Sequence, residues 1–267
     1  MTVDGRDLGL AYRDGAALDR ADEDAHPVVF LHGIPTWSFL WRRIAPPLEP
    51  AVRAVVPDLV GYGNSDRRDC FDRSLRAQEQ ALAGLVDRLG AEAVSLVGHD
   101  IGGGVALRYA AHTDRVEKLV LSNATCYDSW PVEYIATLGL PRTQTMADGD
   151  FEDALDEAFV GGLAADPDPE WTEGIAAPWR RGDGKRAFVR AAVATNTNHT
   201  TEIDYGAIDA DLLCLWGDDD EEQPVDDGRR LVDDVGGEVV ALDGAGHWVT
   251  EDRPEAYRSA LAEFLGA

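Results

Sequence analysis

One turn in the middle of the chain constrains its fold more than any other feature. The apolar stretch 94–97 runs into the sequence GHDIGGG at 98–104, and a helical pattern follows. Glycines at 98, 102 and 103 allow a sharp turn and close backbone packing. Such a turn forces its central side chain, Asp100, into the open above the amino terminus of the next helix. We therefore predict a strand, a tight turn and a helix that together present one carboxylate.

Short apolar runs alternate with helical patterns on both sides of this turn. The runs at 28–31, 54–56, 94–97, 119–121, 212–216 and 239–242 predict buried parallel strands. An amphipathic helix is expected from Ser74 to Leu89, with Ser74 as its N-cap and Gly90 as its stop, and the last helix begins at Pro254. This alternation predicts an α/β fold with a mostly parallel sheet flanked by helices. An antiparallel strand at 8–12 is expected to precede it.

The alternation breaks between residues 125 and 205. This segment is acidic, rich in Gly and Pro in places, and helical in pattern at 151–159. We interpret it as a helical cap inserted into a catalytic domain that comprises residues 1–124 and 206–267.

The charge of the chain limits its partners. It carries 50 acidic and 24 basic residues, a net charge of −26, and only two lysines, Lys118 and Lys185. Nucleic acid is excluded as a partner, because phosphate binding needs Lys and Arg. Acid enrichment with lysine depletion is similar to proteins of salt-in halophiles. We expect a small organic molecule as the partner, and a monomer or small homo-oligomer.

Neither a membrane anchor nor a metal site is expected. No apolar run approaches the ~20 residues that a membrane helix needs, and residues 1–10 lack the apolar core of a signal peptide. We therefore expect a cytoplasmic protein. The three cysteines, Cys70, Cys126 and Cys214, have no CxxC spacing and predict neither a disulfide scaffold nor a zinc site.

Three further motifs follow predicted strands. The stretch HGIPTWSFLWR begins at His32 and can aim the Ile34 N–H at the same oxyanion as the Ile101 N–H. The run WGDDD begins at Trp216, and GAGHW at Gly244 contains His247. The order nucleophile, acid, histidine is that of α/β-hydrolases. We assign the acid to Asp220, with Asp218 and Asp219 left open as alternatives.

These motifs together resemble the α/β-hydrolases that have an aspartate nucleophile. Haloalkane dehalogenases, epoxide hydrolases and fluoroacetate dehalogenases share stretches similar to HGIPTWSFLWR, GHDIGG, GAGHW and the run PDLVGYGNSD from Pro57. The HGxPTWS run is most similar to haloalkane dehalogenases. The resemblance implies Asp100 as nucleophile, His247 as base and Asp220 as its partner, without a metal or cofactor.

A carboxylate nucleophile determines which bonds the enzyme can attack. It displaces a good leaving group from saturated carbon and forms an alkyl-enzyme ester. A water that His247 activates then attacks the carbonyl carbon of Asp100, and the Ile34 and Ile101 N–H groups hold the oxyanion. The expected reaction is hydrolysis at saturated carbon.

The chain departs from the group in two places, so three functions stay open. Haloalkane dehalogenases place Trp directly after the nucleophile to bind the departing halide, whereas this chain has Ile101. Epoxide hydrolases use two cap tyrosines, whereas the tyrosines of this segment lie near its start and its end and none lies in its middle. A haloalkane dehalogenase-like enzyme is the first hypothesis, an epoxide hydrolase the second, and a non-hydrolytic or binding member of the fold the third. Candidate pocket residues are Trp37, Tyr127, Trp130, Tyr134, Trp171 and Trp179, with Tyr205 as a further tyrosine near the end of the cap.

Overall fold

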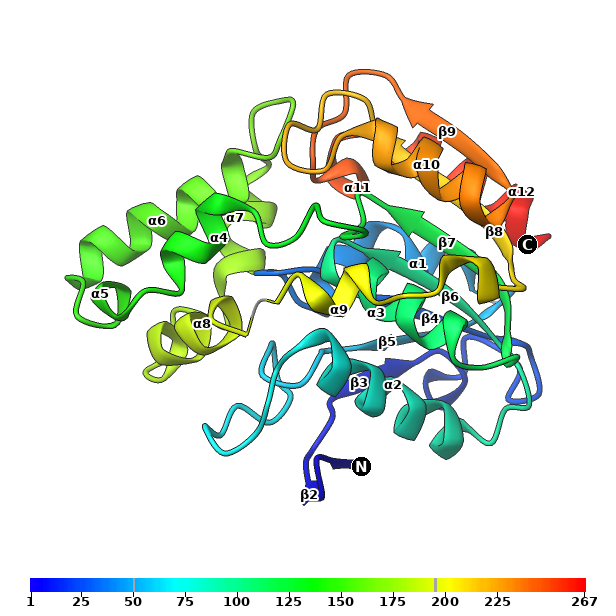
Figure 1. The fold of residues 1–267 in the computed structure, drawn as a ribbon, viewed down its shortest axis with the longest axis horizontal. Helices are drawn as coiled ribbons and strands as arrows, with labels where there is room; N and C mark the ends of the chain where they lie inside the picture. The colour runs from blue at the N-terminus through cyan, green and yellow to red at the C-terminus, as the bar shows by residue number, and fades with distance from the viewer. Residues whose placement is uncertain (50, 195) are drawn as a thin grey trace.

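The computed structural model describes residues 1–49, 51–194 and 196–267. A seven-stranded sheet in the order β3-β5-β4-β6-β7-β8-β9 forms its centre (Figure 1). β3 is antiparallel to β5, and the other neighbouring strands are parallel. The strands are β3 (Tyr12–Asp14), β4 (Pro27–Leu31), β5 (Arg53–Pro57), β6 (Val94–His99), β7 (Val116–Ser122), β8 (Asp211–Gly217) and β9 (Glu238–Leu242). The six predicted parallel strands are confirmed. A separate hairpin consists of β1 (Thr2–Val3) and β2 (Arg6–Asp7).

The expected antiparallel strand at 8–12 was wrong in its position, because β3 begins only at Tyr12. The preceding backbone bonds to a loop and not to a strand. The carbonyl oxygen of Gly9 accepts from the Asp66 N–H, and that of Ala11 accepts from the Asp58 N–H. Leu8 is buried in a small apolar cluster beside the main core. These contacts fix the segment before the sheet begins.

Helices cover both faces of the sheet (Figure 1). On one face lie α2 (Leu75–Leu89), α3 (Ile101–Ala111) and α10 (Val225–Val235), with η3 (Tyr205–Ala207) between the last two. The other face carries η2 (Ser38–Arg43), α1 (Ala45–Leu48), α11 (Val249–Asp252) and α12 (Pro254–Leu265), and η1 (Ala16–Leu18) follows β3. The predicted ends of α2 are confirmed: Ser74 accepts a hydrogen bond from the Ala77 N–H, and Gly90 ends the helix at φ +67°.

Strand register brings the carboxyl ends of five strands to one edge of the sheet. Leu31 of β4 pairs with Gly98 of β6, and Gly98 pairs with Leu121 of β7. Gly217 at the end of β8 pairs with Leu242 at the end of β9. The loops that begin after these residues therefore lie side by side, where ligand sites of parallel sheets form.

Within the described residues, six α-helices lie between β7 and η3 in the chain. They are α4 (Glu133–Leu138), α5 (Pro141–Gln144), α6 (Asp148–Val160), α7 (Pro169–Ala176), α8 (Gly184–Ala192) and α9 (Asn198–Thr201). In Figure 1, α4 to α8 gather beside the sheet and not on either of its faces. Helix α6 covers the stretch 151–159 that was expected to be helical. The division into a catalytic domain and a cap stays a prediction.

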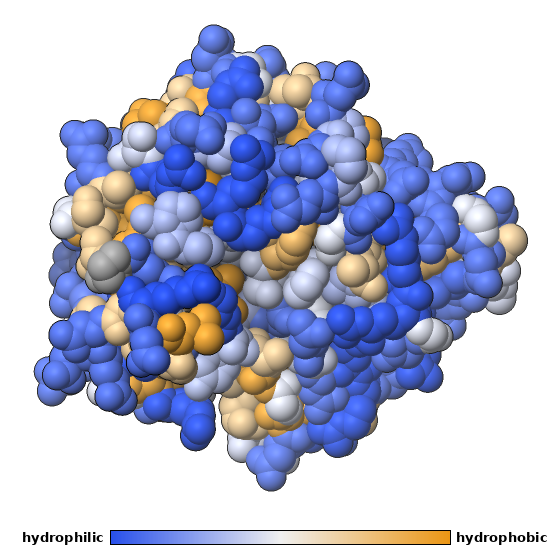
Figure 2. Space-filling view, turned by 180° about the vertical axis from the view of Figure 1, so that it is seen from behind, coloured by the Kyte–Doolittle hydropathy of each residue, from blue (hydrophilic) through white to orange (hydrophobic). Residues whose placement is uncertain are grey.

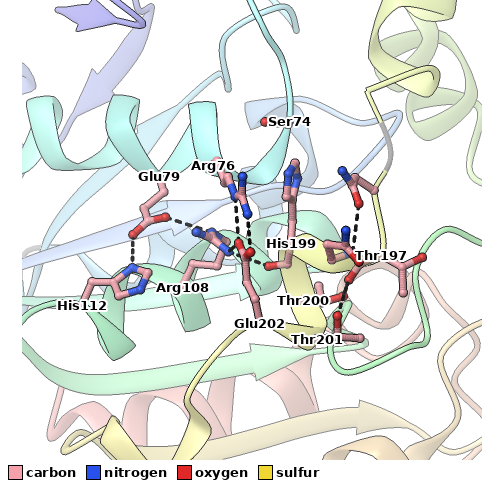
Figure 3. Close-up of polar contacts among 12 residues, drawn as sticks. Ser74, Arg76, Glu79, Arg108, His112, Thr197, His199, Thr200, Thr201 and Glu202 are labelled. Carbon is pink, nitrogen blue, oxygen red and sulfur yellow. Dashed lines mark hydrogen bonds and ion pairs between the residues drawn. The ribbon is translucent and has the colours of Figure 1, made fainter.

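A charged cluster fixes the end of this inserted segment to the helices of the sheet (Figure 3). Arg108 on α3 donates to Glu79 on α2 at 2.9 Å and to the carbonyl oxygen of His199 at 2.8 Å. Arg108 and Arg76 both pair with Glu202, directly after α9. Paired charges around an almost fully buried guanidinium hold α9 in one position on α2 and α3.

The surface reflects the composition. Figure 2 shows one face on which hydrophilic residues predominate and apolar residues form small, separate patches. Among the described residues, no helix has both the length and the apolar character needed to cross a membrane.

Candidate functional site

The turn between β6 and α3 holds Asp100 in an uncommon backbone conformation, with φ +51° and ψ −123°. Side chains are excluded around it: a Cβ on Gly98 would lie 2.7 Å from the Gly102 carbonyl oxygen, and one on Gly103 would lie 2.3 Å from the Ala124 Cβ. The Asp100 side chain makes no capping hydrogen bond to α3. Strained turns of this kind are characteristic of functional sites. Helix capping therefore does not explain the aspartate.

One backbone N–H group donates to the Asp100 carboxylate, and a second acts on its pKa. The Ile34 N–H donates to Asp100 Oδ1 at 2.6 Å, and the adjacent Ile101 N–H favours the ionised carboxylate and so lowers its pKa. A Cβ on Gly33 would lie 2.4 Å from the same Oδ1, so only glycine allows this close approach. The structure thus brings together the nucleophile candidate and both N–H groups expected from the sequence. The same donors are placed to hold an oxyanion on the Asp100 carboxyl carbon.

His32 fixes the loop that carries Ile34. Its Nε2 accepts from the Leu59 N–H at 2.9 Å, so the proton resides on Nδ1, which donates to the Gly33 carbonyl oxygen at 2.9 Å. Burial lowers the pKa of His32 to about 4. The neutral ring links the loops after β4 and β5, which makes it a positioning residue.

His247 and Asp220 form a buried pair. His247 Nδ1 lies 2.9 Å from Asp220 Oδ2, and the other oxygen accepts from the N–H groups of Glu222 and Gln223 at 2.8 and 3.1 Å. With Nδ1–H donating to the carboxylate, Nε2 is left as the basic nitrogen.

The two alternative acids are placed elsewhere. Asp218 accepts from the Gly244 N–H at 2.8 Å. Asp219 is exposed, and its backbone N–H donates to the Ala245 carbonyl oxygen. The hydrogen-bonding acid of His247 is therefore Asp220.

Asn123 belongs to the site and was missed from the sequence. Its Nδ2 donates to Asp220 Oδ2 at 2.6 Å, and its Oδ1 accepts from the Gly217 N–H at 3.2 Å. It has φ +46° and directly follows β7. A polar residue at the carboxyl end of a strand beside β8 was the available signal. Asn123 fixes the orientation of Asp220, and through it that of His247.

Burial and charge act against each other at the three titratable groups. Burial raises the pKa of Asp100 to about 7, although His247 and the two N–H groups oppose this. Burial disfavours protonated His247, but the charge and hydrogen bond of Asp220, together with the Asp100 charge, outweigh it and raise the pKa of His247 to about 9. Asp220 keeps a lowered pKa despite its burial, because of His247 and Asn123.

His99 lies against the base. Its ring centroid is 4.9 Å from that of His247, and its Nδ1 lies 3.3 Å from the Ser122 hydroxyl oxygen. Burial and the nearby His247 lower the pKa of His99 well below its ordinary value. A neutral His99 packs beside His247 without repelling its charged form.

Three of the four candidate tryptophans use their indole N–H within the protein. Each donates to a backbone carbonyl oxygen: Trp37 to Gly174 at 3.0 Å, Trp171 to Phe159 at 3.1 Å and Trp179 to Pro35 at 2.6 Å. Trp37 and Trp179 thereby connect the loop after β4 with the inserted segment. Trp130 is buried in the core. The indole N–H groups of Trp37, Trp171 and Trp179 therefore already have acceptors within the protein.

The tyrosine hydroxyls of the inserted segment also donate hydrogen bonds to groups of the protein. They donate to Asp234 (Tyr127, 2.6 Å), to the Ala154 carbonyl oxygen (Tyr134, 2.8 Å) and to the Thr200 carbonyl oxygen (Tyr205, 3.1 Å). In this arrangement they do not form a pair that converges on Asp100.

A pocket of about 400 Å³ opens beside the base. Its lining consists of Gly161, Gly162, Leu163, Ala164, Asp219, Asp220, Glu221, Glu222, Gly246 and His247. The carboxylate of Glu222 contributes to the raised pKa of both Asp100 and His247. The pocket is therefore acidic. Within the described ranges, no three His, Cys, Asp or Glu side chains are grouped so that they could hold a metal ion.

A mostly parallel sheet whose strand ends present a turn-borne acid, a second acid and a histidine, in this chain order, defines an α/β hydrolase. The family model for the alpha/beta hydrolase fold matches residues 26–254. The chain belongs to this family.

Relatives with different activities resemble the chain to similar degrees. It is 29% identical over 259 residues to a 2-hydroxy-6-oxononadienedioate/2-hydroxy-6-oxononatrienedioate hydrolase of Paraburkholderia xenovorans, with 92% of this chain and 88% of that protein covered. It is 27% identical over 254 residues to haloalkane dehalogenase 2 of Mycobacterium tuberculosis, with 90% and 88% covered. A solved α/β hydrolase fold protein from Burkholderia ambifaria superposes with a TM-score of 0.88 at 25% identity, covering 98% of this chain and 96% of that one.

Proposed function

We propose that the protein hydrolyses a bond at saturated carbon through an alkyl ester on Asp100, as a haloalkane dehalogenase-like enzyme. One observation carries this proposal: a carboxylate, and not a hydroxyl, occupies the strained turn and accepts a hydrogen bond from the Ile34 N–H. In this proposal residues 125–205 form the cap over the site.

The first step is a displacement. An oxygen of ionised Asp100 forms a bond to the substrate carbon as the bond from that carbon to the leaving group breaks, and the electron pair departs with the leaving group. A carboxylate suits saturated carbon, because its attack on an ordinary ester would give a reactive anhydride.

The second step hydrolyses the enzyme's own ester. Nε2 of His247 takes a proton from water, and the water oxygen attacks the carboxyl carbon of Asp100. The oxyanion that forms there accepts from Ile34 and Ile101, and one such donor typically contributes ~3 kcal/mol. Collapse breaks the bond between the carboxyl carbon and the alkoxide oxygen, the alkoxide takes the proton back from His247 and leaves as the alcohol, and Asp100 is regenerated once its carboxyl group ionises. Asp220 stabilises the imidazolium ion.

The surroundings of the site support an uncharged substrate. The pocket beside His247 is lined by acidic side chains, Asp219, Glu221 and Glu222 among them. A substrate carboxylate would meet like charge there. We therefore favour haloalkanes over haloacids. The epoxide hydrolase alternative has less support, because Tyr127, Tyr134 and Tyr205 donate to protein groups.

The test is to trap the ester with His247→Gln. Alkylation needs no base whereas ester hydrolysis does, so this variant should accumulate protein plus one alkyl group. The reaction is run near pH 9, because loss of the His247 charge raises the pKa of Asp100 further. A panel of 1-halobutanes, haloacids and epoxides in molar KCl supplies the substrates, and intact mass is the measurement.

The Asp100→Asn variant is the matched control and should form no adduct. If wild-type protein turns over a panel member but His247→Gln forms no adduct with it, the proposed mechanism is wrong. If no panel member reacts with wild-type protein, the non-hydrolytic alternative gains support.

A further inference from the structure

The proposed displacement leaves negative charge on the departing group, and that charge needs a donor. Ile101 occupies the position where haloalkane dehalogenases have an indole. The N–H groups of Trp37, Trp171 and Trp179 are bonded to carbonyl oxygens, whereas those of Trp41 and Trp248 have no partner among the described residues. If the proposed function is correct, a donor other than the first three indoles therefore stabilises the leaving group.

Tyr62 lies between the loop after β4 and the inserted segment. Its ring packs edge-on against His32 at 5.4 Å and against Trp179 at 5.8 Å between centroids. His32 precedes Gly33, whose backbone meets the Asp100 carboxylate. Trp179 in turn donates to Pro35 of the same loop. Tyr62 is thereby held beside the N–H groups that bind the nucleophile.

The hydroxyl of Tyr62 makes no hydrogen bond to any of the residues that the structure describes. The residue as a whole is only 1% exposed. Buried hydroxyls are normally paired, so this one is open to an acceptor that the chain itself does not supply. Burial raises the pKa of this hydroxyl, the charge of Arg73 lowers it, and the charge of Asp100 raises it by a smaller amount. The hydroxyl thus stays protonated and available as a donor at neutral pH.

We propose that the Tyr62 hydroxyl binds the leaving group during alkylation of Asp100. This inference rests on the proposed function. As the carbon–halogen bond breaks, the halide takes the electron pair and accepts a hydrogen bond from Tyr62. No proton is transferred to a halide, and the ion leaves when the ester has formed. Tyr62 is then a catalytic residue of the first step and has no part in the second.

The test compares alkylation rates in the His247→Gln background, where the adduct accumulates. Tyr62→Phe removes only the hydroxyl and keeps the ring contacts with His32 and Trp179. The substrates are 1-chlorobutane, 1-bromobutane and 1-iodobutane at pH 9, and intact mass follows the adduct over time. Loss of a hydrogen bond to a charged group should slow alkylation by about 10- to 100-fold. The loss should be largest for chloride, the poorest leaving group, and smallest for iodide.

Tyr109→Phe is the control, because Tyr109 is also a buried tyrosine and lies near the far end of α3. It should leave all three alkylation rates unchanged. In the otherwise wild-type chain, Tyr62→Phe should leave the rate of ester hydrolysis unchanged. Equal alkylation rates with Tyr and Phe at position 62 would overturn the proposal. The proposal would also be overturned if the larger loss of rate for chloride than for iodide appeared in Trp130→Phe and not in Tyr62→Phe.

Should Tyr62→Phe fail to fold, 3-fluorotyrosine at position 62 gives a second test. Its more acidic hydroxyl is a stronger donor, so the chloride substrate should gain rate relative to the iodide substrate. An unchanged ratio would count against Tyr62 as donor. If His247→Gln with Tyr62 intact forms no adduct at all, the proposed function fails as well. If the adduct forms at the same rate with Tyr or Phe at position 62, this inference is wrong and the proposed function is not affected.

Discussion

At Asp100, burial and hydrogen bonding act on one carboxylate in opposite directions. Burial raises its pKa to about 7, while His247 and two N–H groups favour the ionised form. The pKa of His247, at about 9, lies above that of Asp100. Between these values the free enzyme therefore holds an Asp100 carboxylate beside a protonated His247. This charge state suits the first step and not the second.

The two half-reactions should consequently differ in pH dependence. Alkylation should accelerate as pH rises through about 7, because only ionised Asp100 attacks. Esterification then removes the Asp100 charge that helps to raise the pKa of His247, so ester hydrolysis should reach its plateau below pH 9. Halide release and alcohol formation, measured by rapid quench between pH 5.5 and 10, separate the steps. A rate of halide release that is constant from pH 5.5 to 8.5 would contradict this account.

Among the elements, the strands and the nucleophile turn could be predicted from the sequence because their signals are local. Buried parallel strands are apolar throughout, and the glycines around Asp100 stand at a fixed spacing in the sequence. The choice of Asp220 among three consecutive aspartates stayed open between them, because it depends on the backbone path of the loop after β8. Asn123 was missed for a similar reason: its role arises from contact with residues of β8 and its loop, almost 100 positions further along the chain.

Side-chain orientation in the inserted segment could not be predicted. The sequence supplied tryptophans and tyrosines, but whether an indole N–H or a hydroxyl is free depends on which carbonyl oxygen lies opposite it. Trp179 meets Pro35 from a distant loop, and Tyr134 meets Ala154 of α6. The short β3 was misplaced because loop contacts of Gly9 and Ala11 exclude that stretch from the sheet.

The whole molecule carries far more negative than positive charge. With 50 acidic and 24 basic residues, most acids lack a basic partner. Several arginines already pair with acids, as Arg53 does with Asp14 and Arg13 with Glu49. Exposed pairs contribute at most ~1 kcal/mol each and cannot compensate for the excess. Repulsion extends over ~30 Å at 0.01 M salt and ~3 Å at 1 M.

Folding should therefore depend on salt. Thermal unfolding at constant pH near neutrality, across KCl from millimolar to multimolar, should give a midpoint that rises steadily, because screening weakens repulsion in the compact state. Sucrose at matched osmolality is the control for effects of solute exclusion, and it should stabilise less. A midpoint that stays flat or falls with KCl would remove the halophile interpretation and leave solubility as the role of the acidic surface.

The most direct test of the central claim follows one oxygen atom. Wild-type enzyme in excess over a substrate that it turns over is allowed a single turnover in ¹⁸O-labelled water. Attack of water on the carboxyl carbon of Asp100 places the label in Asp100 and leaves the first alcohol unlabelled. Peptide mass spectrometry of the Asp100 segment and mass analysis of the alcohol give both quantities. Label in the first alcohol, with none in Asp100, would mean that water attacks the substrate directly and that no ester forms.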